Sequence, residues 1–262
     1  MFQNIRNWLD HRIIQRSKIS PAQWDKAFNS LPLLHGLTSN ERQTLRELAI
    51  LFLHHKVFEG AQGLIVTQAM ALHITLQACL PILKLGLRAY NGWVSVIVYP
   101  TGFTTKRIVR DEDGIEHQVQ SSLAGESWQR GPVVLAWDET EHAGIIDGHN
   151  LVIHEFAHKL DMQNGSANGF PPMHAGMDSV QWGEVFSAGF QDFQYKCSIN
   201  HHIDIDCYAA TSPAEYFAVL SEVFFERPEV IQQHYRKIYG LLRLYYRQDP
   251  LVRLPPSRII TL

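Results

Sequence analysis

The segment LVIHEFAHKL carries two histidines and a glutamate at a spacing suited to metal chemistry. His154 and His158 stand four residues apart, and Glu155 follows the first of them. In a helix this spacing puts two side chains on one face, roughly 6 Å apart along the axis. Two imidazoles so placed can bind one zinc ion at about 2.0–2.1 Å each. A glutamate beside them can accept a proton from a zinc-activated water, so the segment predicts a hydrolytic zinc centre with Glu155 as general base.

The same pattern has a competing explanation, because two histidines and a glutamate can lie on the polar side of an ordinary amphipathic helix. Apolar neighbours argue against it, since they predict a helix buried over most of its circumference: Val152, Ile153, Phe156, Ala157 and Leu160. Burying three polar side chains without a purpose is costly. A strand predicted at 132–137 lies just upstream, where it could align an extended peptide with the site.

The third zinc ligand is not in the longer motif H-E-x-x-H-x-x-G-x-x-H, because Asp161 and Asn164 occupy its glycine and last histidine positions. Another common solution is a glutamate from a later helix. Ser212 and Pro213 predict the start of such a helix, on which Glu215 is a candidate.

Glu215 has a second interpretation, because Ser212-x-x-Glu215 is also a capping box. The sequence pattern weights cap and ligand about equally. Glu222 lies two turns further on nearly the same face, as a rival ligand or as a partner of a ligand. Asp161 is expected either to orient His158 through its other nitrogen or to be a solvated acid at a helix end.

The elements that must position these residues fall into two groups. Residues 21–88 are predicted to be helical, starting at Ser20-Pro21 and including a helix from Ser39 and a buried helix pair at 64–88 interrupted near Pro81. Strands are predicted at 93–99, 104–120 (a hairpin turning at Asp113-Gly114) and 132–137, and helices at 150–163, 178–196, 213–226 and 228–247. Strands followed by helices favour an α+β fold, with a helical part over 1–88 packed on a core over 89–262.

Composition and charge limit the class of protein to which the chain can belong. The 262 residues are 45% hydrophobic and 19% charged, which is typical of a globular chain. The net charge of −3 gives no basic surplus for nucleic acid. We find no signal peptide or membrane-spanning run, which favours a cytoplasmic protein. The basic amphipathic N-terminus could lie on a membrane or a partner, but docking on its own domain, or fraying, is the more ordinary explanation. The three cysteines (Cys79, Cys197 and Cys207) form no disulfide framework and are expected to be thiols.

Two longer segments, HEFAHKLDMQNG and YAATSPAEYFAVLSEVFF, resemble the Mlc titration factor A family of bacterial peptidases, as do LPILKLGL, SWQRGPVVLAW and YYRQDPLVRL. The resemblance implies a zincin-like catalytic core with a small mixed or antiparallel sheet. It also implies one zinc ion per chain, held by His154, His158 and Glu215, with Glu155 as the general base. The resemblance therefore favours the interpretation of Glu215 as a zinc ligand over its interpretation as a capping-box residue.

The site of that family is similar to the site of anthrax lethal factor, in which a tyrosine seven residues before the glutamate ligand assists catalysis. Tyr208 stands seven residues before Glu215. The resemblance implies that its phenol donates a hydrogen bond to the oxyanion of the reaction. The alternative is an ordinary buried tyrosine with a satisfied hydroxyl.

The family name implies a partner, the transcriptional repressor Mlc, whose sequestration would relieve repression of a glucose phosphotransferase gene. The leading hypothesis is therefore a cytoplasmic zinc peptidase, aminopeptidase-like or acting on short peptides, that also binds Mlc. One alternative is an anti-repressor protein-binding module with a structural or vestigial zinc site. Another is a zinc hydrolase of non-peptide substrates.

Overall fold

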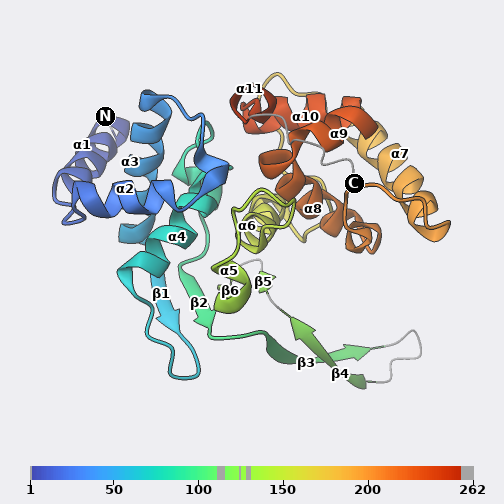
Figure 1. The fold of residues 1–262 in the computed structure, drawn as a ribbon, viewed down its shortest axis with the longest axis horizontal. Coiled ribbons are helices and arrows are strands. Elements are labelled where there is room, and N and C mark those ends of the chain that lie inside the picture. The colour runs from blue at the N-terminus through green and yellow to red at the C-terminus, as the bar shows by residue number, and fades with distance from the viewer. Residues whose placement is uncertain (1, 111–115, 124, 128–130, 255–262) are drawn as a thin grey trace, which may run out of the picture.

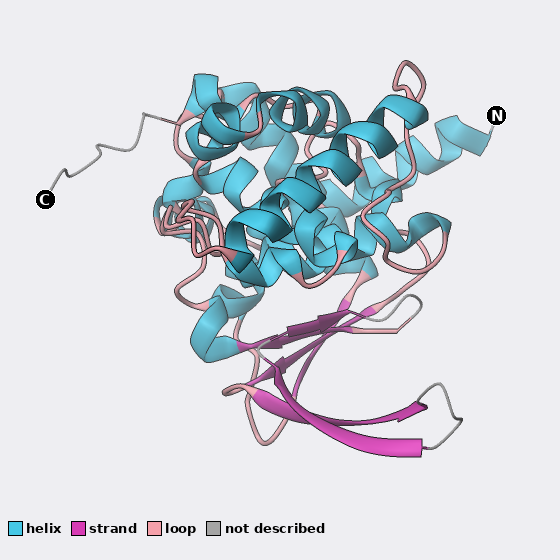
Figure 2. Ribbon diagram, turned by 90° about the vertical axis from the view of Figure 1, so that its right-hand side faces the viewer, coloured by secondary structure: helices cyan, strands magenta, loops and turns pink. Residues whose placement is uncertain are grey.

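A small mixed β-sheet with helices gathered over it forms the framework of the protein (Figure 2). The computed structural model describes residues 2–110, 116–123, 125–127 and 131–254. Within them the strands of this sheet run in the order β1 (Val57–Gly60), β2 (Ser95–Tyr99), β6 (Val133–Ala136) and β5 (Gly125–Ser127). β1, β2 and β6 are parallel, and β5 is antiparallel to β6. The expected α+β fold is confirmed, with the mixed form of its sheet.

The strands predicted at 93–99 and 132–137 are confirmed as β2 and β6. All four residues of β6 are buried, as expected for a strand that is covered on both faces. The predicted hairpin is also present, as β3 (Phe103–Arg110) paired with antiparallel β4 (Glu116–Leu123). Its predicted turn at Asp113-Gly114 lies outside the described residues.

The helices lie on both sides of a central helix, α6, with α1 to α4 on one side and α7 to α11 on the other (Figure 1). They are α1 (Phe2–Gln15), α2 (Pro21–Asn29), α3 (Ser39–His55), α4 (Gln68–Cys79), α5 (Trp137–Thr140), α6 (Leu151–Asp161), α7 (Ser179–Ser198), α8 (Pro213–Glu226), α9 (Pro228–His234), α10 (Arg236–Tyr246) and α11 (Pro250–Arg253), with 3-10 turns η1 (Pro32–Leu34), η2 (Leu87–Tyr90), η3 (Met162–Asn164) and η4 (Cys207–Ala210). Among the described helices, none combines the length and the apolarity needed to cross a membrane.

Helix α6 is held in place by an aromatic cluster on its buried side. The Phe156 ring lies 5.7 Å from Phe52, 5.2 Å from Tyr90 and 5.7 Å from Trp93, measured between ring centroids. The opposite side of α6 faces α8, a helix whose apolar residues are nearly all buried. Close packing of this kind fixes side-chain positions, so the two helices can present polar groups to each other at defined distances.

Helix starts were the most reliable local signals. Ser20 caps α2 in a capping box with Gln23, and Pro21 occupies the first helical position, as predicted. Helix α3 begins at Ser39 with Thr38 as its cap. The N-terminal helix α1 packs on α3 through Ile13, as expected for docking on its own domain.

The structure corrects several expectations about the elements. Residues 21–88 are not wholly helical, because β1 pairs with β2. The expected helix pair at 64–88 is wrong, since α4 ends at Cys79 and only the short η2 follows. The helix expected at 228–247 is broken at Tyr235, between α9 and α10. The division into parts at residue 88 stays a prediction.

The strand expected to align a peptide is also placed differently. β6 is paired on both edges, with β2 and with β5, so it offers no free edge. The short β5, which sequence patterns did not predict, ends the described sheet on the side of α6.

Candidate metal centre

The two histidines of the candidate site are displayed by the middle of α6. The helix begins at Asn150, whose Oδ1 accepts a hydrogen bond from the backbone N–H of Ile153 at 2.9 Å. This cap fixes the first turn, and the four-residue spacing then puts His154 and His158 on one face. Their ring centroids lie 4.8 Å apart, and their Nε2 atoms are 3.2 Å apart.

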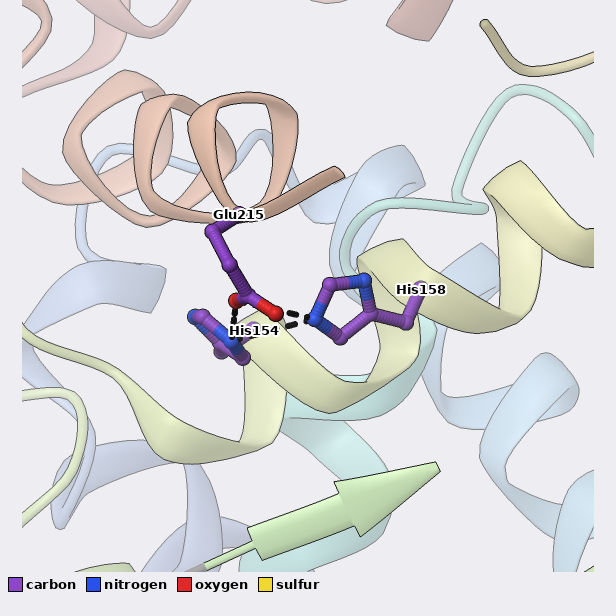
Figure 3. Close-up of side chains that lie close together, drawn as sticks. All are labelled: His154, His158 and Glu215. Atoms are coloured by element: carbon purple, nitrogen blue, oxygen red, sulfur yellow. Dashed lines mark hydrogen bonds and ion pairs between the residues drawn. The ribbon is translucent and has the colours of Figure 1, made fainter. Parts of the chain in front are cut away.

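Glu215 reaches this pair of histidines from the first turn of α8 (Figure 3). Its Oε2 lies 3.0 Å from Nε2 of His154 and 3.2 Å from Nε2 of His158. Ser212 does cap α8, through a 3.2 Å bond from the Glu215 backbone N–H to its Oγ. The Glu215 carboxylate nevertheless faces the imidazoles instead of completing the capping box.

The three side chains fit the ligand set of a zinc ion. Four tetrahedral ligands at about 2.0–2.1 Å from zinc lie about 3.3 Å from one another, and the three donor atoms here are 3.0–3.2 Å apart. Two nitrogens and one carboxylate oxygen leave a fourth position open, which is typical of catalytic zinc. Within the described part of the chain, His154, His158 and Glu215 are the one group of at least three such side chains close enough to share an ion.

Glu222 lies on the far side of His154 and acts on its orientation. Oε1 of Glu222 is 2.7 Å from Nδ1 of His154, and Oε2 accepts the backbone N–H of Asn150 at 2.5 Å. An Nδ1–H that donates to Glu222 leaves the Nε2 lone pair directed at the metal position. Of the two roles considered for Glu222, the geometry favours the partner of a ligand.

Charge complementarity also supports a cation at this position. Burial alone would lower the pKa of His154, but Glu222, Glu215 and Glu155 raise it well above its ordinary value. Burial pushes the pKa of Glu215 up, and the two imidazoles overcome this and hold it below its usual range. The surrounding carboxylates thus draw positive charge into the site, which a divalent cation also supplies.

Behind Glu222, a further buried network holds the start of α6. The Asn150 amide donates to Glu226 at 2.7 Å and to Gln77 of α4 at 2.8 Å. Glu226 also accepts the backbone N–H of Gly148 at 3.0 Å. Burial raises the pKa of Glu226 to about 7, against the lowering effect of these hydrogen bonds. Sequence reasoning missed this network, although the spacing of Glu222 and Glu226 on one helix face was a signal for it.

Glu155 is buried beside the histidines, with 4% of its surface exposed. Its Oε1 lies against β5 at Gly125, where a Cβ atom would come within 2.4 Å of it. Its Oε2 has no hydrogen-bond partner among the described residues. Burial raises the pKa of Glu155, and the two histidines moderate the effect. A carboxylate with a raised pKa and one open oxygen suits a general base.

Asp161 fits neither of the roles expected from the sequence. It is fully buried, and its carboxylate accepts three backbone N–H groups, those of Asn168, Gly169 and Phe170, at 2.7–2.9 Å. It therefore fixes the loop after α6 instead of orienting His158 or being solvated. Nδ1 of His158 has no partner in the described part of the structure.

Tyr208 lies on η4, across the site from α6. Its ring centroid is 6.1 Å from that of His154, and 49% of the residue is exposed. The exposure is contrary to the alternative of an ordinary buried tyrosine. The Asp206 carboxylate caps η4 by accepting the Tyr208 backbone N–H at 2.8 Å.

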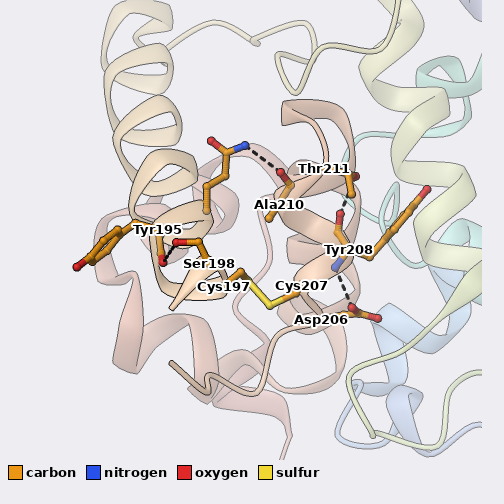
Figure 4. The surroundings of a disulfide bond; sticks show 9 residues. Tyr195, Cys197, Ser198, Asp206, Cys207, Tyr208, Ala210 and Thr211 are labelled. Carbon is orange, nitrogen blue, oxygen red and sulfur yellow. Dashed lines mark hydrogen bonds between the residues drawn. A yellow bond between two sulfur atoms is a disulfide. The ribbon is translucent and has the colours of Figure 1, made fainter. Parts of the chain in front are cut away.

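A disulfide bond joins Cys197, at the end of α7, to Cys207, the residue before Tyr208 (Figure 4). The expectation of three thiols is therefore wrong for this pair, and only Cys79 is a free, buried thiol. An odd count of cysteines indicated no framework of disulfides, but it does not exclude a single bond. The bond ties the segment that carries Tyr208 to a long helix.

A cavity of about 420 Å³ opens beside the candidate metal centre. His154, Glu155 and Tyr208 line it, together with residues from the loop before α6 and from α8. The site thus combines three convergent metal donors, a buried carboxylate with an open oxygen, and space for a ligand. These features define a metallopeptidase-type centre, a class that binds its substrate in such a cleft.

Comparison with known proteins agrees with this class. The family model described as glucose-regulated metallo-peptidase M90 matches residues 5–247. "Mlc titration factor A" of Yersinia pestis (strain Pestoides F) is 39% identical over 246 residues, covering 89% of this chain and 87% of the relative. The protein of that name from Yersinia pseudotuberculosis serotype O:1b (strain IP 31758) has the same identity and coverage. The chain belongs to the M90 metallopeptidase family, and the resemblance seen in the sequence is confirmed.

Proposed function

We propose that this protein is a zinc-dependent peptidase with a zincin-like core, in which His154, His158 and Glu215 hold one zinc ion. The convergence of Nε2, Nε2 and Oε2 at 3.0–3.2 Å carries the proposal. The neighbouring cavity supports a peptide substrate, and β5 supplies a strand along which an extended peptide can align.

The residues around the ion have distinct roles in this mechanism. Zinc, when bound, lowers the pKa of a water molecule and polarises the substrate carbonyl. Glu155 accepts a proton from the attacking water at its open oxygen and passes it to the leaving amine. Tyr208 donates a hydrogen bond to the oxygen on which negative charge develops. Glu222 keeps His154 in the tautomer that presents Nε2.

The Glu155→Gln variant tests the mechanism. Glutamine keeps the size of the side chain but cannot act as a base, so we expect zinc content to stay at one per chain while kcat falls by about 10²–10⁴-fold. A matched control is Glu184→Gln on the exposed side of α7, which should keep both the zinc content and the kcat of the wild-type protein. Wild-type turnover by the Glu155→Gln protein would remove the proposed role of Glu155.

We propose as a second function that the chain binds the repressor Mlc in the cytoplasm. The supporting observation is the name of its relatives, Mlc titration factor A. A pull-down of Mlc with wild-type and Glu155→Gln protein separates the two functions. If both proteins retain Mlc, the result supports binding that does not depend on peptidase activity. If neither protein retains Mlc, the result contradicts the proposed binding.

A further inference from the structure

The cavity beside the metal centre has an uneven distribution of charge. Besides Glu155 and Glu222 of the candidate metal centre, carboxylates line it from three further segments: Glu139 of α5, Asp147 of the loop before α6, and Asp206 at the start of η4. No lysine or arginine is among the described residues that line it. Arg227, which lies close by at Gly148, is already paired with Asp204 at 2.9 Å and with Glu229 at 3.7 Å.

The two aspartates are held in fixed orientations. Oδ1 of Asp147 accepts the backbone N–H of His149 at 2.8 Å, and Oδ1 of Asp206 accepts that of Tyr208 at 2.8 Å. In both residues the second oxygen has no bond to a described residue. Each aspartate can therefore accept a further hydrogen bond at its second oxygen while Oδ1 keeps its bond to the backbone N–H.

An independent observation at the inner end of the cavity also points to a ligand. Glu155, one of the residues that line the cavity, is 96% buried, and its Oε2 has no hydrogen-bond partner in the described structure. A buried oxygen of this kind is costly unless a ligand or water supplies a donor.

The lining of the cavity has an apolar region besides the carboxylates. Ala143, Leu151 and Val219 supply it, and Ala143 and Val219 are buried. A side chain with an aliphatic stem and a cationic tip matches both regions, because its stem covers apolar surface while its charge reaches the aspartates. An α-ammonium group has no such stem.

We infer that this cavity binds the side chain of a lysine or arginine residue close to the scissile bond of the substrate, with Asp147 and Asp206 as specificity-determining residues. The inference rests on the proposed peptidase function. It predicts that cationic peptides are bound and cleaved in preference to neutral peptides of the same shape. The field of the unpaired carboxylates also draws such peptides towards the cleft.

The test uses N-acetylated fluorogenic peptides that carry Lys, norleucine or Glu at each position around the cleavage site in turn. Norleucine retains a linear aliphatic stem and lacks the ammonium group. Two partly exposed ion pairs together should give about a tenfold preference for Lys over norleucine, in kcat/KM and in equilibrium binding to the wild-type zinc protein. The preference should weaken as salt is added.

The Asp147→Asn/Asp206→Asn double variant removes the two charges but keeps an oxygen for each turn, because asparagine caps as well as aspartate. We expect its Lys-to-norleucine ratio to fall towards one. The matched control is Asp178→Asn, the same change at the exposed cap of α7 outside the cavity, which should keep the wild-type ratio.

Two results would overturn the inference. They are a wild-type protein that does not prefer Lys, and a preference that is unchanged in the double variant. Absence of hydrolysis for every peptide would instead count against the peptidase function. The binding comparison would still decide whether the cavity selects cationic side chains.

Discussion

Replacing Glu222 by glutamine should weaken zinc binding although Glu222 is not one of the three proposed ligands. Its carboxylate accepts two hydrogen bonds, from Nδ1 of His154 at 2.7 Å and from the backbone N–H of Asn150 at 2.5 Å. Glutamine has one acceptor oxygen, so its NH₂ group must face one of these two donors. If the NH₂ faces His154, Nδ1 must become an acceptor and the proton moves to Nε2, the atom that would bind zinc.

The expected size of the effect follows from this loss. Partners that orient metal-bound histidines contribute about 10–100-fold in metal affinity, which corresponds to about 1.4–2.7 kcal/mol. Because Glu222 is buried, with 6% exposed, solvent does not replace the lost bond. We therefore expect the zinc Kd of Glu222→Gln to rise by about 10–100-fold.

A chelator-competition titration at constant pH measures this change directly. The matched control is Glu226→Gln, one turn further along α8, whose carboxylate contacts Gly148 and the Asn150 amide but not His154. We expect its Kd to stay within about threefold of the wild-type value. A folded Glu222→Gln protein with wild-type affinity would refute the reasoning. Equal losses in both variants would show that the effect comes from the start of α6 and not from the orientation of the imidazole.

Three further predictions follow from the same structure. Tyr208→Phe should lower kcat by about 10–100-fold at unchanged zinc content, because the oxyanion loses a donor, and an unchanged kcat would contradict this role. Folding raises the pKa of Glu226 from 4.5 to about 7. Between these pH values the folded chain binds more protons than the unfolded chain, so the Glu226 carboxyl lowers the free energy of unfolding increasingly as pH rises. Urea unfolding should therefore show Glu226→Gln gaining roughly 3 kcal/mol relative to wild type between pH 4.5 and 8, and a constant difference would contradict this. Replacing Cys197 and Cys207 by serine should lower the free energy of unfolding by about 2–3 kcal/mol, as expected for a cross-link between residues ten apart, and reductant should then have no further effect.

Local sequence patterns predicted the parts of this protein that depend on neighbouring residues. The four-residue spacing of His154 and His158 determines their common face in any helix. Ser212 and Pro213 fixed the start of α8, and with it the turn on which Glu215 lies. For these residues the prediction needed no knowledge of the rest of the fold.

The parts that depend on distant pairing were predicted less well. The four-residue β1 became a strand only because β2, 38 residues further along the chain, pairs with it in parallel. The sequence left the role of Glu215 open because a cap and a ligand require the same local pattern. Packing of α8 against α6 brings its carboxylate to the imidazoles. The disulfide also depends on how α7 and η4 meet, which no spacing of cysteines revealed.

The central claim is that His154, His158 and Glu215 hold one zinc ion, and anomalous diffraction at the zinc absorption edge tests it most directly. For crystals of the zinc-loaded protein we predict one strong peak at about 2.0–2.2 Å from Nε2 of His154, Nε2 of His158 and a carboxylate oxygen of Glu215. A peak that lies elsewhere, or no peak between α6 and α8 in protein shown to contain zinc, would contradict the claim.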